Sequence, residues 1–200
     1  SAAAASAMVI VNTVVIVKDI GLSQRDVALT LAAFGGGSIS AALILPRLLD
    51  HIADRTVMMI AAAALTLALA ALAVIATTMP PGPNYWHVLL AGWLVMGIAY
   101  SASVTPSGRL LRRSTNADDR PALFAAQFAL SHVCWLICYP LVGLLGARIS
   151  MSAAFAGMAL LSAIGVVAAL RLWPASDPNV VSHEHRDLAE AQIAVRLGAA

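Results

Sequence analysis

The sequence predicts an all-α integral membrane protein in which six hydrophobic helices cross the bilayer. Of its 200 residues, 60% are hydrophobic and 11% are charged, whereas an ordinary soluble domain carries about 25% charged residues. The charged residues also cluster, which leaves long stretches of sequence without any charge. Such a chain cannot cover a soluble fold with polar side chains, and its uncharged stretches have about the length that a membrane-spanning helix needs.

Six spans follow from the uncharged stretches, and each is expected to be helical because a helix satisfies its own backbone polar groups within lipid. The stretch 56–108 is too long for one span. It divides at Pro80, Pro81, Gly82 and Pro83, residues that end helices and favour turns. The expected spans are 1–17, 27–46, 56–78, 88–107, 122–147 and 149–170.

The chain divides into a six-span transmembrane domain, 1–173, and a polar tail, 174–200, whose composition changes sharply. Residue 1 is a serine followed at once by an apolar run. We therefore interpret the first span as truncated and the chain as one part of a longer protein.

Positive charges are divided unevenly between the two sides of the expected membrane domain. Only Lys18, Arg25 and Arg148 lie on the side of the first connection. The positive-inside rule places the more basic side in the cytoplasm. The sequence thus predicts a multi-pass protein of the cell (inner) membrane with a cytoplasmic C-terminus. The basic residues of the predicted cytoplasmic side are Arg47, Arg55, Arg109, Arg112, Arg113, Arg120, Arg171, Arg186 and Arg196.

Polar side chains are concentrated in four of the six spans. Spans 56–78 and 149–170 consist mainly of Ala, Leu, Val and Ile, and a helix that is apolar all round can face lipid. The other four should face protein or a water-filled cavity. The order polar, polar, apolar occurs twice, which predicts two three-helix repeats. The candidate cavity-lining residues are Asn12, Ser38, Tyr100, Ser103, Gln127, Ser131, His132, Trp135 and Tyr139.

Over 1–173 this architecture resembles the C-terminal half of a major facilitator superfamily transporter. Each half of that fold contains two inverted three-helix repeats, and a signature commonly written G-x-x-x-D-R-x-G-R-R/K follows the second helix of a half. The corresponding stretch here is 46–55, in which Asp50 and Arg55 match and four other positions, Asp54 among them, depart from the pattern. The resemblance implies half of a twelve-helix fold.

The partners that the resemblance implies are a small-molecule substrate, the lipid bilayer and a missing N-terminal half of six helices. The predicted function is secondary active transport of a small solute by alternating access, as export or antiport. The alternative is a membrane-embedded enzyme or assembly subunit, for which Ser131, His132, Cys134 and Tyr139 are the candidate cluster. No Walker loop, H-E-x-x-H or hydrolase serine motif occurs, and no enzymatic activity, cofactor, metal or nucleic-acid partner is expected.

His132 is the one Asp, Glu, Lys, Arg or His side chain expected deep inside a span. It is the eleventh residue of span 122–147, so at 1.5 Å per residue it lies roughly 15 Å deep, near the bilayer midplane. One interpretation is a substrate contact or proton relay, since intramembrane ionisable groups mark functional sites and histidine titrates near neutral pH. The other is a neutral histidine that bonds to a neighbouring helix.

Prolines and glycines inside the spans predict local irregularities. Pro106 and Pro140 are expected to bend or end the helices that contain them. The glycines at 35–37 lie in the middle of a span, where each weakens a helix by about 1 kcal/mol. They are expected to serve as a flexible point or as a surface for close packing, of which packing is preferred.

Overall fold

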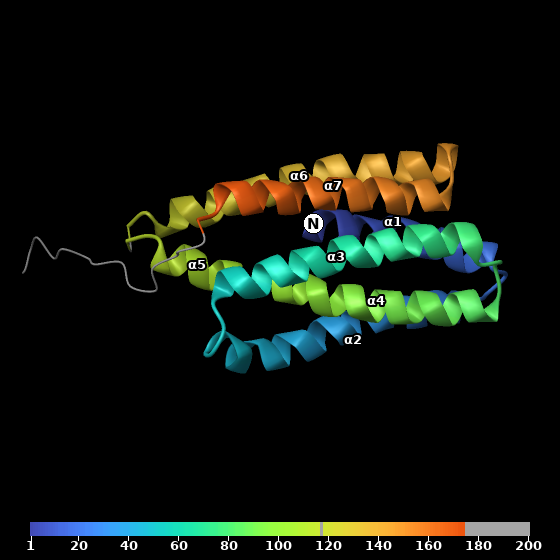
Figure 1. Cartoon of the computed structure of the whole chain (residues 1–200), viewed down its shortest axis with the longest axis horizontal. Coiled ribbons are helices and arrows are strands. Elements are labelled where there is room, and N and C mark those ends of the chain that lie inside the picture. The colour runs from blue at the N-terminus through green and yellow to red at the C-terminus, as the bar shows by residue number, and fades with distance from the viewer. Residues whose placement is uncertain (117, 175–200) are drawn as a thin grey trace, which may run out of the picture.

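The computed structural model describes residues 1–116 and 118–174, which form a bundle of long helices (Figure 1). Six of these helices are long and apolar enough to cross a membrane, which confirms the predicted spans. A short seventh helix, α5, was not expected. The helices are α1 (Ala2–Asp19), α2 (Gln24–Leu49), α3 (Asp54–Thr78), α4 (Pro83–Val104), α5 (Ser107–Arg113), α6 (Arg120–Arg148) and α7 (Met151–Leu172). Most of the predicted polar tail lies outside the described residues.

The prolines have different effects on the helices that contain them. α4 ends at Val104 and α5 begins after Pro106, as expected of a residue that has no N–H to donate. In contrast, Pro140 lies inside α6 and Pro46 inside α2, which continues to Leu49. The second helix therefore extends three residues beyond the predicted span 27–46, and Pro140 does not end its helix. Membrane helices tolerate proline because neighbouring groups satisfy the freed carbonyl.

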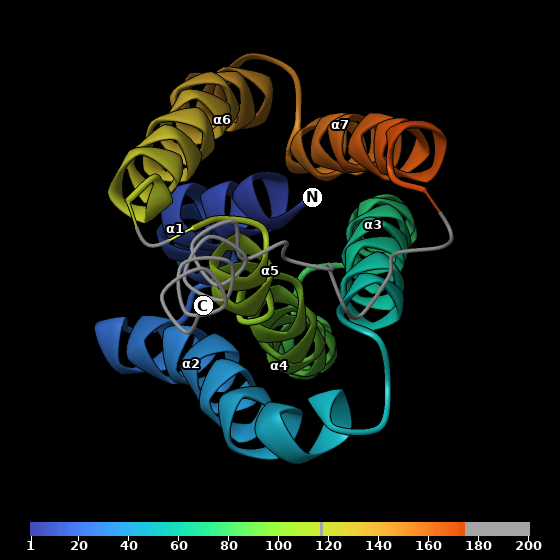
Figure 2. The ribbon, with the colours of Figure 1, turned by 90° about the vertical axis from the view of Figure 1, so that its left-hand side faces the viewer.

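The helices form two three-helix units that exchange contacts. The second helix of each unit packs against the first helix of the other, so α2 lies on α4 and α6 lies on α1. The third helices, α3 and α7, pack against each other. The end-on view places α3 and α7 on one side of the bundle and α2 and α6 on the other (Figure 2). This arrangement is the one expected of two inverted repeats, with α1 and α4 between the two sides.

Trp93 of α4 joins three helices in the centre of the bundle. Its side chain is fully buried, and its Nε1 donates a hydrogen bond of 2.9 Å to Oγ1 of Thr13 on α1. The Thr13 hydroxyl in turn donates to the carbonyl of Val9. The indole ring meets the ring of Phe155 on α7 edge to face, at 6.0 Å between centroids. A buried indole needs such a partner for its N–H, so the core combines apolar packing with a satisfied polar pair.

Two glycines bring the backbones of α2 and α4 together. A Cβ atom on Gly37 would overlap the carbonyl oxygen of Leu94, and a Cβ on Gly97 would overlap the carbonyl oxygen of Phe34. Around Gly35 and Gly36, no atom lies within 4 Å of the position that a Cβ would take. The expected packing role of the glycine run is therefore confirmed at Gly37, because small residues let membrane helices approach closely.

Helix α6 is loosely packed in comparison with the rest of the bundle. Its buried residues are Cys138 and Val142, although the helix is 29 residues long. Phe128, Leu130 and Leu136 expose between 64% and 71% of their surface. Much of α6 therefore presents side chains outward, and the candidate lining residues of the predicted fifth span lie on this helix.

Candidate functional site

A row of ring-bearing side chains runs along α6, which we call the aromatic row: Phe128, His132, Trp135 and Tyr139. The rings of Phe128 and His132 lie 4.0 Å apart between centroids. The distance from His132 to Trp135 is 5.8 Å, and so is the distance from Trp135 to Tyr139. Because helical residues three and four apart share a face, the sequence folds these rings into one continuous strip.

Three members of the aromatic row, His132, Trp135 and Tyr139, line an open cavity of about 390 Å³ on the surface of α6. The opposite flank of α6, with Cys134 and Cys138, lines a separate pocket against α1 and α7; both cysteines are free thiols, the first exposed and the second buried. The lining residues of the 390 Å³ cavity are Ala129, His132, Val133, Trp135, Leu136 and Tyr139. All of these residues lie on α6, so the cavity is open on the side away from this helix.

A separate ring pair joins α4, which carries Tyr100, to α2. The Tyr100 ring contacts the ring of Phe34 on α2, with 5.5 Å between centroids. Trp135 and Tyr139 therefore lie in the aromatic row of α6, whereas Tyr100 pairs with Phe34, a residue that the sequence did not indicate.

His132 is exposed, and its hydrogen bond stays within its own helix. Nδ1 lies 2.8 Å from the carbonyl oxygen of Phe128. A carbonyl only accepts hydrogen bonds, so we assign a proton to Nδ1, and in this tautomer Nε2 is the acceptor nitrogen of the ring. The bond expected to a neighbouring helix does not occur on this nitrogen. The histidine thus presents an acceptor on the aromatic row.

The remaining predicted lining residues have more varied surroundings. Ser131 and Ser103 donate to carbonyls of their own helices, those of Phe128 and Tyr100. Ser38 is half-buried and Gln127 is exposed. Ser131 therefore lies beside the aromatic row, and the contact of all four side chains with a solute stays a prediction.

Asn12 lies in the contact between α1 and α6. It is buried, and its Nδ2 donates to the sulfur of Met8 at 3.3 Å. Its Oδ1 lies 3.2 Å from the position that a Cβ on Gly146 would take. Glycine on α6 therefore makes room for a polar side chain between two helices, and in this conformation Asn12 packs rather than borders the cavity.

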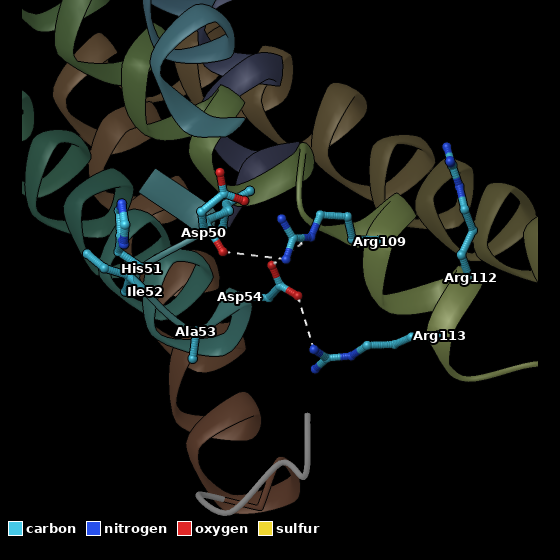
Figure 3. A pocket seen from close by; sticks show the side chains of 9 residues that line it. Asp50, His51, Ile52, Ala53, Asp54, Arg109, Arg112 and Arg113 are labelled. Atoms are coloured by element: carbon cyan, nitrogen blue, oxygen red, sulfur yellow. Dashed lines mark hydrogen bonds and ion pairs between the residues drawn. The ribbon is translucent and has the colours of Figure 1, made fainter. Parts of the chain in front are cut away.

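A second polar site lies at the end of the bundle where α3 begins and where α5 lies (Figure 3). It is a pocket of about 690 Å³, which we call the arginine pocket. The connection between α2 and α3 forms one wall and the arginines of α5 form the other. Its lining residues are Leu49, Asp50, His51, Ile52, Ala53, Asp54, Arg109, Arg112 and Arg113.

Asp54 is the charged centre of the arginine pocket. Its side chain is 1% exposed, and it forms ion pairs with Arg109 at 3.5 Å and Arg113 at 3.3 Å. These distances exceed good charge-assisted hydrogen bonds, so the attraction is mainly Coulombic. Arg109 and Arg113 are one helical turn apart on α5 and reach the same carboxylate, whereas Arg112 points away from it (Figure 3).

The two residues that match the transporter signature have different positions. Asp50 is exposed on the wall of the arginine pocket. Arg55 donates from Nη2 to the carbonyl oxygen of Trp173 at 3.1 Å, and its guanidinium lies 6.0 Å from the centre of that indole ring. The start of α3 is thereby attached to α5 through Asp54 and to the end of α7 through Arg55.

Sequence reasoning identified Asp50 and Arg55 but missed Asp54, which departs from the signature. The available signal was the charge distribution. The α2–α3 and α4–α6 connections were already predicted to lie on one side of the membrane, and the acidic residue at the start of α3 had to find a cation there. Since burial of an unpaired carboxylate is costly, the arginines of the other connection were the natural partners.

The chain was also compared with known proteins. The family model described as Major Facilitator Superfamily matches residues 1–198. No curated protein and no solved structure matched the chain. The family match covers almost the whole sequence, and the six apolar helices with exchanged three-helix units fit the same family. The chain therefore belongs to the major facilitator superfamily of membrane transporters.

Proposed function

We propose that this chain forms one six-helix half of a secondary transporter that exports or exchanges a small solute by alternating access. The second six-helix half lies opposite α2, α4 and α6 in this proposal. The observation that carries it is the aromatic row, which lies on α6, the helix with the fewest buried residues among the six long helices. A site between two repeated halves near the midplane is how such folds bind solutes.

The geometry of α6 favours transport over the alternative of an embedded enzyme. Catalysis by the cluster around His132 would need a nucleophile bonded to a base. Ser131 and His132 both direct their polar groups to the same carbonyl, that of Phe128, and the Ser131 Oγ lies 3.5 Å from His132 Nδ1. The hydroxyl is therefore not held as an activated nucleophile, while a surface for noncovalent binding is present.

The first prediction concerns orientation. The end of the bundle that carries α5 holds most of the positive charge, so we expect that end and the chain end after Ala200 to lie in the cytoplasm, in a cell (inner) membrane. Green fluorescent protein fused after Ala200 should fluoresce, and alkaline phosphatase fused there should be inactive. Active phosphatase with a dark fluorescent fusion would reverse the orientation.

The second prediction tests the water-filled cavity that alternating access requires. In a background with Cys134 and Cys138 replaced by Ala, Leu136→Cys and Ala129→Cys on α6 should react with a charged, water-soluble thiol reagent. A cysteine in lipid reacts slowly because its thiolate is disfavoured. We expect labelling at least about tenfold faster than at lipid-facing positions.

Leu67→Cys on α3 and Leu160→Cys on α7 are the matched controls. Leu67, Leu160 and Leu136 expose 69%, 65% and 71% of their surface, so exposure alone does not separate them. The proposal requires that only the α6 positions meet water. Equal labelling rates on α3, α6 and α7 would contradict the assignment of α6 to a cavity.

A further inference from the structure

We propose that the aromatic row and its cavity bind an uncharged, planar aromatic solute that carries a hydroxyl or N–H donor. This inference rests on the proposed transport function and names the class of its substrate. The solute stacks on the row at Trp135 and donates its hydrogen bond to Nε2 of His132. Each element of this proposal follows from a separate property of α6.

The ring contacts determine the shape of the solute. Successive rings lie between 4.0 and 5.8 Å apart, with interplanar angles of 33° to 64°, so they form a strip of π-faces and edges rather than a closed stack. Aromatic rings attract one another in offset and edge-to-face arrangements. A flat aromatic molecule contacts several members of the strip at once, and the cavity of about 390 Å³ admits a molecule of one to three rings.

The hydrogen bond of His132 determines the polar group of the solute. Nδ1 donates to the carbonyl of Phe128, so Nε2 is an acceptor and needs a donor from the solute. A hydroxyl or an N–H satisfies it, whereas an ether or a carbonyl oxygen leaves two acceptors facing each other. The site therefore prefers solutes that carry a donor, because an unmatched polar group in a low-dielectric site costs free energy.

The absence of charge along the row determines the charge of the solute. Residues 121–147 contain no Asp, Glu, Lys or Arg, and 27–46 and 88–104, in the other helices of the proposed cavity side, contain none either. An ion in this cavity would lose hydration without gaining a counter-charge from these helices, which is costly. We therefore assign an uncharged solute rather than an aromatic cation or carboxylate.

Binding of β-naphthol to the full-length protein in nanodiscs tests the inference by calorimetry. Three probes separate its elements: β-naphthol has aromatic rings and a hydroxyl donor, its methyl ether lacks the donor, and decalol keeps the hydroxyl but has saturated, non-aromatic rings. We expect β-naphthol to bind about fivefold tighter than the ether, for one hydrogen bond. We expect it to bind about three- to tenfold tighter than decalol, for the lost stacking.

Variants assign these preferences to the row. Trp135→Leu should weaken β-naphthol about three- to tenfold, and Trp135→Phe, which keeps a ring, should restore most of the affinity. His132→Leu should abolish the preference for β-naphthol over its ether. Phe124→Leu removes an aromatic side chain of α6 outside the row and should leave all three affinities unchanged.

The outcomes distinguish this inference from the transport proposal. If β-naphthol partitions equally into empty nanodiscs without saturation, or binds the Trp135 and His132 variants as tightly as the parent, the assigned solute class is wrong. Water access at Leu136→Cys would then still support a transport cavity. If β-naphthol saturates with the expected order of probes and variants, the row is a binding site for this class of solute.

Discussion

Replacement of both Arg109 and Arg113 by Gln is expected to lower the free energy of unfolding by about 3 kcal/mol. The double substitution leaves the carboxylate of Asp54, which is 1% exposed, without the two cations beside it. Removal of the partners of a buried charge costs about 3–5 kcal/mol. The lower end applies here because Arg109 is 51% exposed and part of its interaction is screened by solvent.

The third substitution in this series is Asp54→Asn. Added to the Arg109→Gln, Arg113→Gln background, it should recover most of the lost stability, because the uncharged amide no longer needs cations. Arg112→Gln is the matched control on the same helix, and should change stability by no more than about 0.5 kcal/mol. Chemical unfolding of the purified protein in mixed micelles measures each effect. A triple variant less stable than the double variant would contradict the charge-pairing explanation.

A comparably large effect is expected at Gly97. In Gly97→Ala the new Cβ overlaps the carbonyl oxygen of Phe34, and a backbone atom cannot move aside by a rotamer change. The helices α2 and α4 must separate, at a cost of about 2–3 kcal/mol, toward the upper end for added volume in a packed contact. Gly37→Ala should behave in the same way against the carbonyl of Leu94.

Gly36→Ala is the control for this substitution. Gly36 lies on α2 and has no atom within 4 Å of a Cβ placed on it. Alanine there removes a helix-weakening residue, so stability should stay the same or rise by up to about 1 kcal/mol. Both variants are measured by thermal unfolding in the same detergent. Equal loss of stability in Gly36→Ala and Gly97→Ala would mean that helix–helix distance is not the cause.

The sequence determined the helices and their grouping better than it determined individual contacts. Uncharged length alone predicts a spanning helix, and the polarity of the spans predicted which two are the third helices of their repeats, α3 and α7. Neither signal reports on α5, a seven-residue helix in a connection. The start of α5 depends on the break at Pro106, and its position depends on ion pairs with Asp54, which lies more than fifty residues earlier in the sequence. A pattern of neighbouring residues does not report on such a distant contact.

In the candidate site, too, the sequence predicted which residues share a helix face better than it predicted their contacts. Helical spacing alone was enough to place His132, Trp135 and Tyr139 on one face, and the structure adds Phe128 to that face as a ring contact. A polar residue inside a span was taken to line a cavity, yet Asn12 packs against Gly146 between helices. A polar side chain in the membrane needs a hydrogen-bonding or packing partner. A small residue on the neighbouring helix, such as Gly146, leaves room for that side chain to pack against protein instead of a solute.

The contacts of Gly37 and Gly97 with the main chain of the facing helix limit how α2 and α4 can move relative to each other. Each glycine lies against a main-chain oxygen of the other helix, so a slide of α2 along α4 would press a side chain one turn away, such as Ala41 or Ser101, into that oxygen. We therefore expect α2 and α4 to keep their relative position along the helix axes and to move together. Glycines of α6 meet side chains instead, as Gly146 meets Asn12 of α1, and side chains can move aside, so we expect α6 to shift more easily against α1 than α2 does against α4.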